Sequence, residues 1–420
     1  MWRLTDEQRE FREHVREVVL EKVRPRVLEI DESGEYPYDI HEILAAEGLL
    51  GLAIPKEYGG GGYAEVASCA LIEELAKVSG TVSLMSAYVV LTSLPILIAG
   101  SDEQKKRFVG PLTSGEKLGC YAVTEPHVGS DPAALQTTAE RHGDTWVING
   151  EKRFIGNAGI GDIHVVFART GAEGAKGISV FVVPGDAPGV SVKELQTMGM
   201  PGWKLGAPKY ENVEVPEDHL LGGEGDGFLT AMLTFDRSRP TVAAQAVGLG
   251  QGAVDLALDY ATRRHAFGKP LFGHEGVQFK LADMEADVAA ARALTFQAAT
   301  FVDEGDERMS KLSSMAKMIA SDTAMRVTTD AVQILGGNGY LKDFPAERMM
   351  RDAKVLQIYE GANDIQRLVI ARKMMEQAES RDPIWPTIMP GADGVADGRG
   401  APGPAGQQDA PEQEKAGASA

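Results

Sequence analysis

The chain contains 420 residues, 43% of them hydrophobic, and carries a formal net charge of −19. This length exceeds the size at which one hydrophobic core keeps growing, so two or three packed domains are expected. The negative charge argues against nucleic acid as a partner, because phosphate binding requires a basic surface, although a local basic mouth for a nucleotide-like ligand stays compatible with it.

The cysteines and the apolar runs exclude further classes. Cys69 and Cys120 are too few for a disulfide framework and lack the spacing of a metal site, so no metal is expected. No uninterrupted apolar run of about 18 residues occurs, and we therefore expect no membrane span. The N-terminus is polar and acidic, unlike a signal or transit peptide, which favours a cytoplasmic protein.

Helical patterns dominate the first third of the chain. Thr5 and Gln8 form a capping-box pattern, and apolar residues recur at helical spacing from Phe11 to Val23, up to Pro25. Similar patterns cover residues 41–49, 64–78 and 83–99. The four glycines at 59–62 predict a loop rather than a phosphate cradle, since no strand precedes them in a βα unit.

Short alternating segments at 145–148, 163–167, 178–183 and 210–215 then predict an all-β unit. Helical patterns return from 227 to 379, with breaks at 268–270, 303–305 and 336–339. This order predicts an N-terminal helical domain at 1–120, a middle β-domain at 121–226 and a C-terminal helical bundle at 227–380. Residues 381–420 are rich in Gly, Ala, Pro, Asp, Gln and Glu, which predicts a disordered tail.

No Gly-x-Gly-x-x-Gly motif follows a predicted strand, so a Rossmann nucleotide site is not supported. Gly248, Gly250 and Gly252 come nearest to that motif. They lie within a helical pattern, where close helix packing is the better explanation. A flavin, if bound, would therefore have to lie between domains.

Glu360 stands between apolar and aromatic neighbours in the segment DAKVLQIYEG, residues 352–361. An apolar setting raises the pKa of a carboxyl group toward working pH, as the removal of a proton from a weak carbon acid requires. The alternative is a helix N-terminal acid whose partners are backbone N–H groups.

Two longer segments surround this candidate base. Residues 121–131 read YAVTEPHVGSD, and residues 330–352 read DAVQILGGNGYLKDFPAERMMRD. Together they resemble the two signature motifs of the acyl-CoA dehydrogenase family, over roughly residues 1–378. The resemblance implies a mainly α fold with a central β-domain: an N-terminal helical domain, a small middle β-barrel or sandwich, and a C-terminal four-helix bundle.

The resemblance also implies an activity, namely FAD-dependent α,β-dehydrogenation of an acyl-CoA to a trans-2-enoyl-CoA, as in fatty-acid β-oxidation. Glu360 would remove the α-proton while flavin N5 accepts hydride from the β-carbon. The Glu360 backbone N–H and a ribityl hydroxyl would bind the thioester oxygen where enolate charge develops. Electron-transfer flavoprotein would be the acceptor, and the chain would form a homotetramer or homodimer.

The remaining site residues follow from the same resemblance. Contacts to FAD are expected from Tyr121, Val123, Thr124, Ser130, Phe154, Gly156, Arg264, Phe267, Gln333, Gly336, Gly337, Ala362 and Asp364. Contacts to acyl-CoA are expected from Ser130, Phe235, Ser238, Arg239, Tyr359 and Gly361. The Arg264 fork suits a diphosphate, and it would reach the FAD of a neighbouring subunit.

Each of these assignments has a simpler alternative. Thr124 and Ser130 would otherwise cap a loop, and Phe154 would be part of the core. Arg264 would be a solvated helix-end residue, and Arg239 would belong to a cluster of surface charges. Serine at position 238 replaces the base that some family members carry there, and a hydroxyl cannot abstract a carbon-bound proton unaided.

Departures from the family pattern leave the acceptor and the acyl group open. Gly156 stands where many relatives carry a Thr whose hydroxyl donates to the flavin, and glycine also occurs among oxygen-reducing relatives. There are thus two alternatives to a dehydrogenase. One is an acyl-CoA oxidase that passes electrons to O2, and the other is a non-catalytic flavin or acyl-CoA binding protein. Val82 stands where the glutaryl-specific branch has Arg, so a dicarboxylyl substrate is disfavoured. We expect a short, branched or cyclic acyl group.

Overall fold

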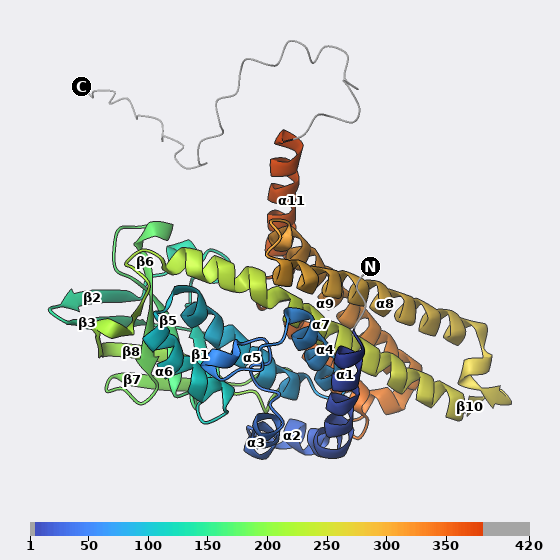
Figure 1. The fold of residues 1–420 in the computed structure, drawn as a ribbon. Coiled ribbons are helices and arrows are strands. Elements are labelled where there is room, and N and C mark those ends of the chain that lie inside the picture. Colours follow the sequence, from blue (N-terminus) through green and yellow to red (C-terminus); the bar gives the residue numbers. More distant parts are fainter. Residues whose placement is uncertain (1–4, 381–420) are drawn as a thin grey trace, which may run out of the picture. The chain divides into compact units, whose positions relative to one another are not determined.

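The computed structural model describes residues 5–380, and the chain divides into two compact units, residues 1–373 and 374–420. Within the first unit, helices come first, a sheet follows, and helices return (Figure 1). The predicted fold class, mainly α with a central β-domain, is confirmed. The predicted tail at 381–420 lies outside the described residues.

The N-terminal region is built from helices. They are α1 (Asp6–Val18), α2 (Val27–Ser33), α3 (Tyr38–Ala46), α4 (Glu65–Ala76), α5 (Gly80–Ala99) and α6 (Asp102–Thr113). The capping box of Thr5 and Gln8 is formed as predicted, and Ser101 with Gln104 forms a second one at α6. Both boxes satisfy amide groups that the first helical turn leaves without a helical partner.

The helical path does not end at Pro25, contrary to the prediction. A π-helical turn at Val19–Val23 and a 3-10 turn at Arg24–Arg26 carry it on into α2. The proline falls in the first turn of the 3-10 segment, where a backbone amide would have no helical partner anyway. Proline therefore redirects the chain here instead of stopping the helix.

Among the described helices, α5 alone is long and apolar enough to cross a membrane, with a mean hydropathy of 2.0. Of its most apolar stretch, 72% is buried inside the protein. It packs against α4, α7 and β1 (Gly119–Ala122). The core position of α5 accounts for its composition.

The middle region is a nine-stranded sheet. After β1 come β2 (Thr138–His142), β3 (Thr145–Glu151), β4 (Ile155–Gly156), β5 (Ile163–Arg169), β6 (Ile178–Pro184), β7 (Val190–Leu195), β8 (Leu205–Pro216) and β9 (Leu220–Leu221). One path runs β4-β8-β3-β2-β5-β6-β9, with β1 parallel to β5 and β7 antiparallel to β8. The four predicted strands are present. The polar β2 and β7 and the short β1, β4 and β9 were not predicted.

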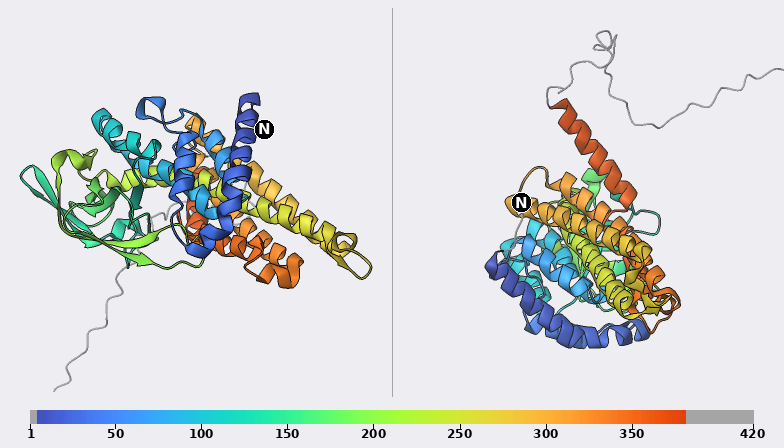
Figure 2. Two further views of the ribbon diagram at one scale, coloured as in Figure 1. Left: turned by 90° about the horizontal axis from the view of Figure 1, so that it is seen from below. Right: turned by 90° about the vertical axis from the view of Figure 1, so that its right-hand side faces the viewer.

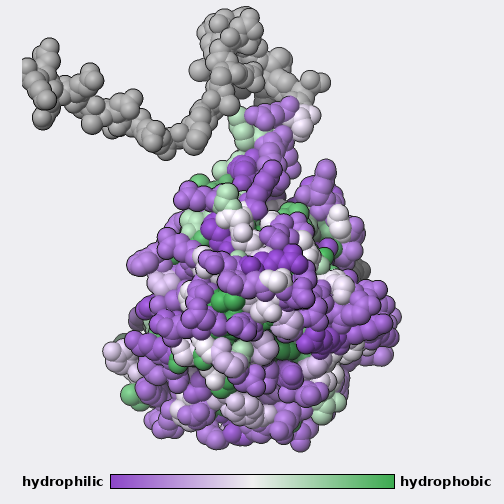
Figure 3. All heavy atoms as spheres, turned by 90° about the vertical axis from the view of Figure 1, so that its left-hand side faces the viewer, coloured by the Kyte–Doolittle hydropathy of each residue, from purple (hydrophilic) through white to green (hydrophobic). Residues whose placement is uncertain are grey.

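A small core holds the two halves of this sheet together. The halves join through the single pair Thr138 and Arg169 between β2 and β5. Trp146 of β3 and Phe181 of β6 pack edge to face at 5.2 Å within one buried cluster. Seen from the sheet side, the surface is largely hydrophilic with scattered hydrophobic residues (Figure 3).

The C-terminal region is a helical bundle. It comprises α7 (Gly227–Arg263), α8 (Glu275–Glu304), α9 (Met309–Leu335), α10 (Pro345–Leu356) and α11 (Asn363–Glu379), with a small hairpin of β10 (His265–Ala266) and β11 (Lys269–Pro270) after α7. The long α7 also packs along α4 and α5, as the views of Figures 1 and 2 show. A Cβ at Gly248 or Gly252 would collide with the carbonyl oxygens of Glu73 or Lys77. These glycines therefore serve close helix packing, as predicted.

Candidate active site

Glu360 lies in a tight turn between α10 and α11. Its φ is +53°, and that of Gly361 is +83°, so two consecutive residues have left-handed backbone conformation. Such a φ is uncommon for a residue with a side chain and points to a constrained site. The turn directs the Glu360 carboxylate toward α7.

Ser238 of α7 meets this carboxylate. Its Oγ donates a hydrogen bond of 2.9 Å to Glu360 Oε2, joining residues that lie far apart in the sequence. Within residues 5–380, no backbone amide donates to the Glu360 side chain. The alternative of a helix N-terminal acid bound by backbone amides therefore does not describe Glu360.

The surroundings of Glu360 shift its proton affinity. Burial raises the pKa of the carboxyl group above its usual range, whereas the Ser238 hydrogen bond and the charges of Arg239 and Lys317 lower it. The net pKa remains raised. A partly buried carboxylate with this balance is suited to accept a proton near neutral pH.

Arg239 is buried and not a surface charge. Its Nη1 lies 2.5 Å from Asp236 Oδ1 and 3.2 Å from Ser314 Oγ, and the residue is 6% exposed. These contacts fix the guanidinium beneath the Glu360 turn. A direct contact with a substrate phosphate would require this buried side chain to become accessible, since its Nη1 is already engaged with both partners.

Tyr359 points into the helical core. Its hydroxyl donates to Gln245 Oε1, and Gln245 Nε2 donates to Gly80 O at 3.0 Å and to Ser83 Oγ at 2.8 Å. This network ties the connection between α10 and α11 to α7 and α5. Gln245 was not identified from the sequence, since a glutamine within a helical pattern carries no specific signal.

The first motif reaches the same region through aromatic contacts. Tyr121 of β1 packs edge to face on Phe235 of α7 at 5.8 Å. Its amide donates to the Tyr88 hydroxyl at 3.3 Å. Burial raises the pKa values of Tyr121 and Tyr88, and the charge of nearby Glu360 raises them further. Segments near 121, 235 and 360 are thus brought together.

A buried ion pair supports the loop after β1. Lys152 Nζ lies 2.8 Å from Glu125 Oε1 and 3.1 Å from the Val123 carbonyl, and Lys152 has no exposed surface. Glu125 also accepts from the amides of Gln136 and Thr137. Sequence analysis gave neither residue a role. The only signal available was a lysine directly after an alternating strand.

Gly156 faces two aromatic rings. A Cβ at this position would lie 2.7 Å from Trp203 Nε1 and 2.9 Å from the Tyr88 hydroxyl, which donates to Gly156 O at 3.3 Å. The rings of Tyr88 and Trp203 pack edge to face at 4.9 Å. The packing of these rings therefore requires glycine at 156.

The other residues predicted to contact the flavin here differ in exposure and in partners. The Thr124 hydroxyl and amide have no hydrogen-bond partner among the described residues, and Ser130 is exposed. Phe154 is 57% exposed and has a φ of +59°. Ala362 is half-buried, whereas Asp364 is exposed near Arg367. Phe154 is not a core residue.

Another predicted group lies at the opposite end of α7. Arg264 ends this helix, and Phe267 follows in the β10–β11 hairpin with 96% exposure. Asn338 Nδ2 donates to the Tyr260 hydroxyl at 2.9 Å and so ties the C-terminal end of α7 to the turn after α9. This turn contains Gly336 and Gly337, and Gln333 lies one helical turn before it. Roughly 40 Å of α7 separates Ser238 from Arg264, given the rise of an α-helix.

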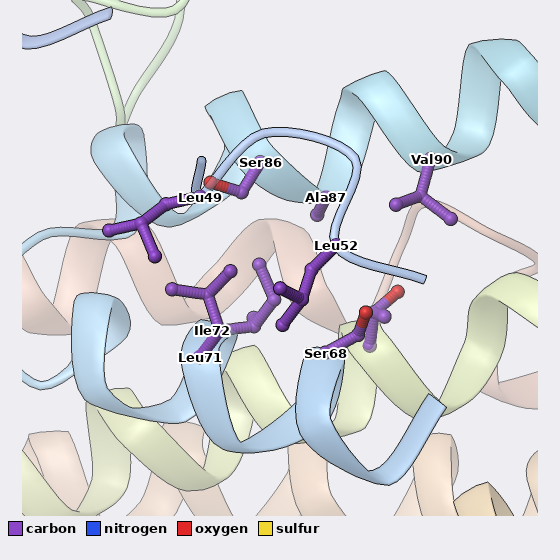
Figure 4. A pocket seen from close by; sticks show the side chains of 9 residues that line it. Leu49, Leu52, Ser68, Leu71, Ile72, Ser86, Ala87 and Val90 are labelled. Carbon is purple, nitrogen blue, oxygen red and sulfur yellow. The ribbon is translucent and has the colours of Figure 1, made fainter. Parts of the chain in front are cut away.

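A small apolar cavity lies between α4, α5 and the segment 49–52 (Figure 4). It is lined by Leu49, Leu52, Ser68, Leu71, Ile72, Ser86, Ala87, Val90 and Thr241. The hydroxyls of Ser68 and Ser86 are buried there without a hydrogen-bond partner among the described residues. With a volume of about 10 Å³, the cavity has room for one bridging water rather than an acyl chain.

Comparison with known proteins identifies the class to which this fold and site belong. The chain matches the N-terminal domain of acyl-CoA dehydrogenase at residues 5–116, the middle domain at 120–213 and the C-terminal domain at 225–375. The chain therefore belongs to the acyl-CoA dehydrogenase family. It is an oxidoreductase of the type that dehydrogenates acyl-CoA thioesters with FAD.

Individual relatives are similar over nearly the whole chain. An acyl-CoA dehydrogenase of Bacillus subtilis is 41% identical over 375 residues, covering 89% of this chain and 99% of the relative. A cyclohex-1-ene-1-carbonyl-CoA dehydrogenase of Geobacter metallireducens is 44% identical over 379 residues, covering 89% and 100%. The structure of butyryl-CoA dehydrogenase from Megasphaera elsdenii has a TM-score of 0.87 at 39% identity, covering 89% and 100%.

Proposed function

We propose that Glu360 is the base that removes the α-proton of an acyl-CoA thioester. The observation that carries this proposal is the position of its carboxylate, held by Ser238 beside the segment of the first motif. Burial raises the pKa of Glu360 above the range of an exposed carboxyl group, so that the anion is a stronger base. Activity should consequently fall as the pH drops through this raised pKa.

The residues of this chain would then act as follows. Ser238 orients Glu360 Oε2 and leaves Oε1 for the proton, while the charges of Arg239 and Lys317 favour the ionised carboxylate. The Glu360 backbone N–H would bind the thioester oxygen where negative charge develops. FAD, when bound, supplies the acceptor for the hydride that leaves the β-carbon. The product is a trans-2-enoyl-CoA.

Free donors on the chain fit FAD. The Thr124 amide and hydroxyl have no partner among the described residues and could donate to the flavin. The residues that would surround the ring are Tyr121, Val123, Thr124, Phe154 and Gly156, with Ser130, Ala362 and Asp364 at its edges. At the other end of α7, the exposed Arg264 suits a diphosphate. A Cβ at Gly336 or Gly337 would meet nothing within 4 Å, so a ligand could approach their backbone closely.

The separation of these two groups supports a site shared between subunits. The distance of roughly 40 Å along α7 is longer than an extended FAD molecule. Arg264, Phe267, Gln333, Gly336 and Gly337 of one copy would therefore complete the FAD site of another. This arrangement requires at least two copies of the chain, as in a homodimer or homotetramer. For the location of the protein, we propose the cytoplasm.

Replacing Arg264 by Ala tests this arrangement. The variant should bind FAD about 10- to 100-fold more weakly, since a charge-assisted hydrogen bond to a phosphate contributes about 1.5–3 kcal/mol. Its helical content should not change, because the side chain is exposed and makes no hydrogen bond or ion pair within the described part of the chain. Flavin content after dialysis and circular dichroism measure the two effects.

Mixed oligomers provide a sharper control. A subunit with Arg264→Ala and a subunit with Glu360→Gln should together form one intact site, if each site takes Glu360 from one copy and Arg264 from another. Co-expression should then restore reduction of the flavin that stays bound after dialysis, because Glu360→Gln alone holds flavin without reducing it and Arg264→Ala alone loses flavin. No recovery would contradict a site shared between subunits.

For the acyl part of the thioester, we propose a short, branched or cyclic group. Tyr88 and Trp203 crowd the side of the site at Gly156. The similarity to relatives that act on butyryl-CoA and on cyclohex-1-ene-1-carbonyl-CoA supports the same choice. Val82 offers no positive charge for a second carboxylate. Anaerobic titration with a panel of CoA thioesters, followed by flavin absorbance, tests the proposal, and bleaching by such a substrate would also exclude a non-catalytic binding protein.

For the acceptor, we propose electron-transfer flavoprotein. Gly156 motivates the second candidate, an oxidase that passes electrons to O2, because no side chain at this position donates a hydrogen bond to the flavin. Peroxide formed in equal amount with enoyl-CoA, without any protein acceptor, would decide for the oxidase. Reduced flavin that is stable in air for many turnover times would decide for the protein acceptor.

A further inference from the structure

The turn that carries Glu360 needs support from outside itself. Both Glu360 and Gly361 have positive φ values, and α11 begins at Asn363, only two residues later. A left-handed conformation at a residue with a side chain persists only when its surroundings fix it. The contacts of the two backbone carbonyls show what fixes it here.

Both carbonyls of the turn accept hydrogen bonds from buried side chains. Gln366 Nε2 lies 3.3 Å from the Glu360 carbonyl and 2.9 Å from the Gly361 carbonyl. Lys317 Nζ of α9 lies 2.8 Å from the Gly361 carbonyl. Lys317 and Gln366 have no exposed surface, so the turn is held from the interior of the protein.

Lys317 also holds the first residue of α11. Its Nζ lies 3.0 Å from Asn363 Oδ1, and Asn363 Nδ2 donates to Ser321 Oγ at 2.9 Å and to Asp322 Oδ1 at 2.8 Å. The ammonium group thus ties Gly361 of the turn and the first residue of α11 to α9. Among residues 5–380, no carboxylate lies within ion-pair distance of it, so its direct partners are neutral oxygens.

We propose that Lys317 is a positioning residue for the catalytic base: its ammonium group fixes the Glu360–Gly361 turn by binding Gly361 O and Asn363 Oδ1, and its charge favours the ionised carboxylate. This inference rests on the proposed function of Glu360. A buried charge that binds neutral carbonyls has no stabilising ion partner in return for its lost hydration. A role in fixing the turn and favouring the ionised form of Glu360 gives a reason for a lysine at this position.

The electrostatic part of the proposal has a definite sign. The groups that face the ammonium group are Glu360 of the turn, Arg239 of α7 and Asp322 of α9. Burial lowers the pKa of Lys317 to about 7, against the attraction of Glu360. Removing this charge should raise the pKa of Glu360 further, because Lys317 is one of the groups that lower it.

Lys317→Met and Lys317→Gln separate position from charge. In the methionine variant, reduction of the bound flavin by an acyl-CoA should slow about 100-fold, the effect of a misplaced group of about 1 Å. The Kd of the acyl-CoA should change less than about threefold, since Lys317 has no exposed surface to offer a substrate. The glutamine variant keeps a donor and should recover part of the rate. In both variants the acid limb of the pH profile should move to higher pH.

The measurement is anaerobic stopped-flow reduction, expressed per bound flavin, with Glu360→Gln and Lys209→Met as references. Lys209 lies in an exposed pair with Glu211 on β8 and should behave as wild type when replaced. If Glu360→Gln reduces normally, the base itself is misassigned. If that variant is inactive but Lys317→Met keeps the wild-type rate and pH profile, the positioning role is wrong. The activity lost in Lys317→Met and Lys317→Gln could also reflect only lost flavin, in which case the rate per bound flavin would equal that of wild type. That result would overturn the positioning role, because it is what a merely structural role of Lys317 predicts.

Discussion

Glu360→Gln is expected to retain yellow, FAD-loaded protein while flavin reduction by an acyl-CoA falls by about 10²–10⁴-fold, the contribution of a positioned general base. Glutamine has nearly the same shape, and its amide oxygen can still accept the Ser238 hydrogen bond. It cannot take up a proton from carbon at neutral pH. Stopped-flow absorbance under anaerobic conditions measures the rate directly, and flavin absorbance before mixing verifies the cofactor content.

Ser238→Ala is the matched control. This variant removes the hydroxyl from Glu360 Oε2 but leaves the carboxylate, so it should slow flavin reduction far less than Glu360→Gln does. Its acid limb should move to higher pH, because the Ser238 hydrogen bond lowers the pKa of Glu360. Near-normal reduction in Glu360→Gln, together with inactivity of Ser238→Ala, would transfer the essential role to α7.

Lys152→Met is expected to lower the free energy of unfolding by about 3–5 kcal/mol, as when one partner of a buried ion pair is removed. The Glu125 carboxylate would keep the amides of Gln136 and Thr137 but lose its buried ion partner, and the Val123 carbonyl would lose its donor. Because the loop at Val123 belongs to the proposed flavin site, FAD should also dissociate more readily. Urea denaturation and flavin fluorescence measure the two effects.

The pH dependence of this loss has a defined direction. Burial raises the pKa of Glu125, but the Lys152 charge and the hydrogen bonds outweigh burial and bring this pKa below its usual range. Stability from Glu125 is thus present above the unfolded pKa and lost as the pH falls through the folded one. The difference between wild type and variant should therefore shrink in acid. The double variant Lys152→Met, Glu125→Gln should recover part of the loss, and a loss equal to the single variant at every pH would contradict a role for the pair.

The local character of most segments was predictable from the sequence. The capping box at Thr5, the four strands found by alternation and the glycine packing at Gly248 and Gly252 depend on nearest neighbours or on periodicity along one element. Pro25 was misjudged because its effect depends on the hydrogen-bond register of the preceding turn, which a π-helical segment shifts. Strands β2 and β7 were not predicted because their side chains are mostly exposed and polar.

Two signature motifs in the sequence were enough to determine the family and to single out Glu360, because a motif records residue types at fixed spacing. The tertiary structure alone decided what surrounds this carboxylate: Ser238 on α7, the buried Arg239 and Lys317, and the packing of Tyr88 and Trp203 over Gly156. These contacts join residues far apart in the sequence, and the burial that shifts a pKa is a property of the packed interior, which no periodicity along the chain encodes.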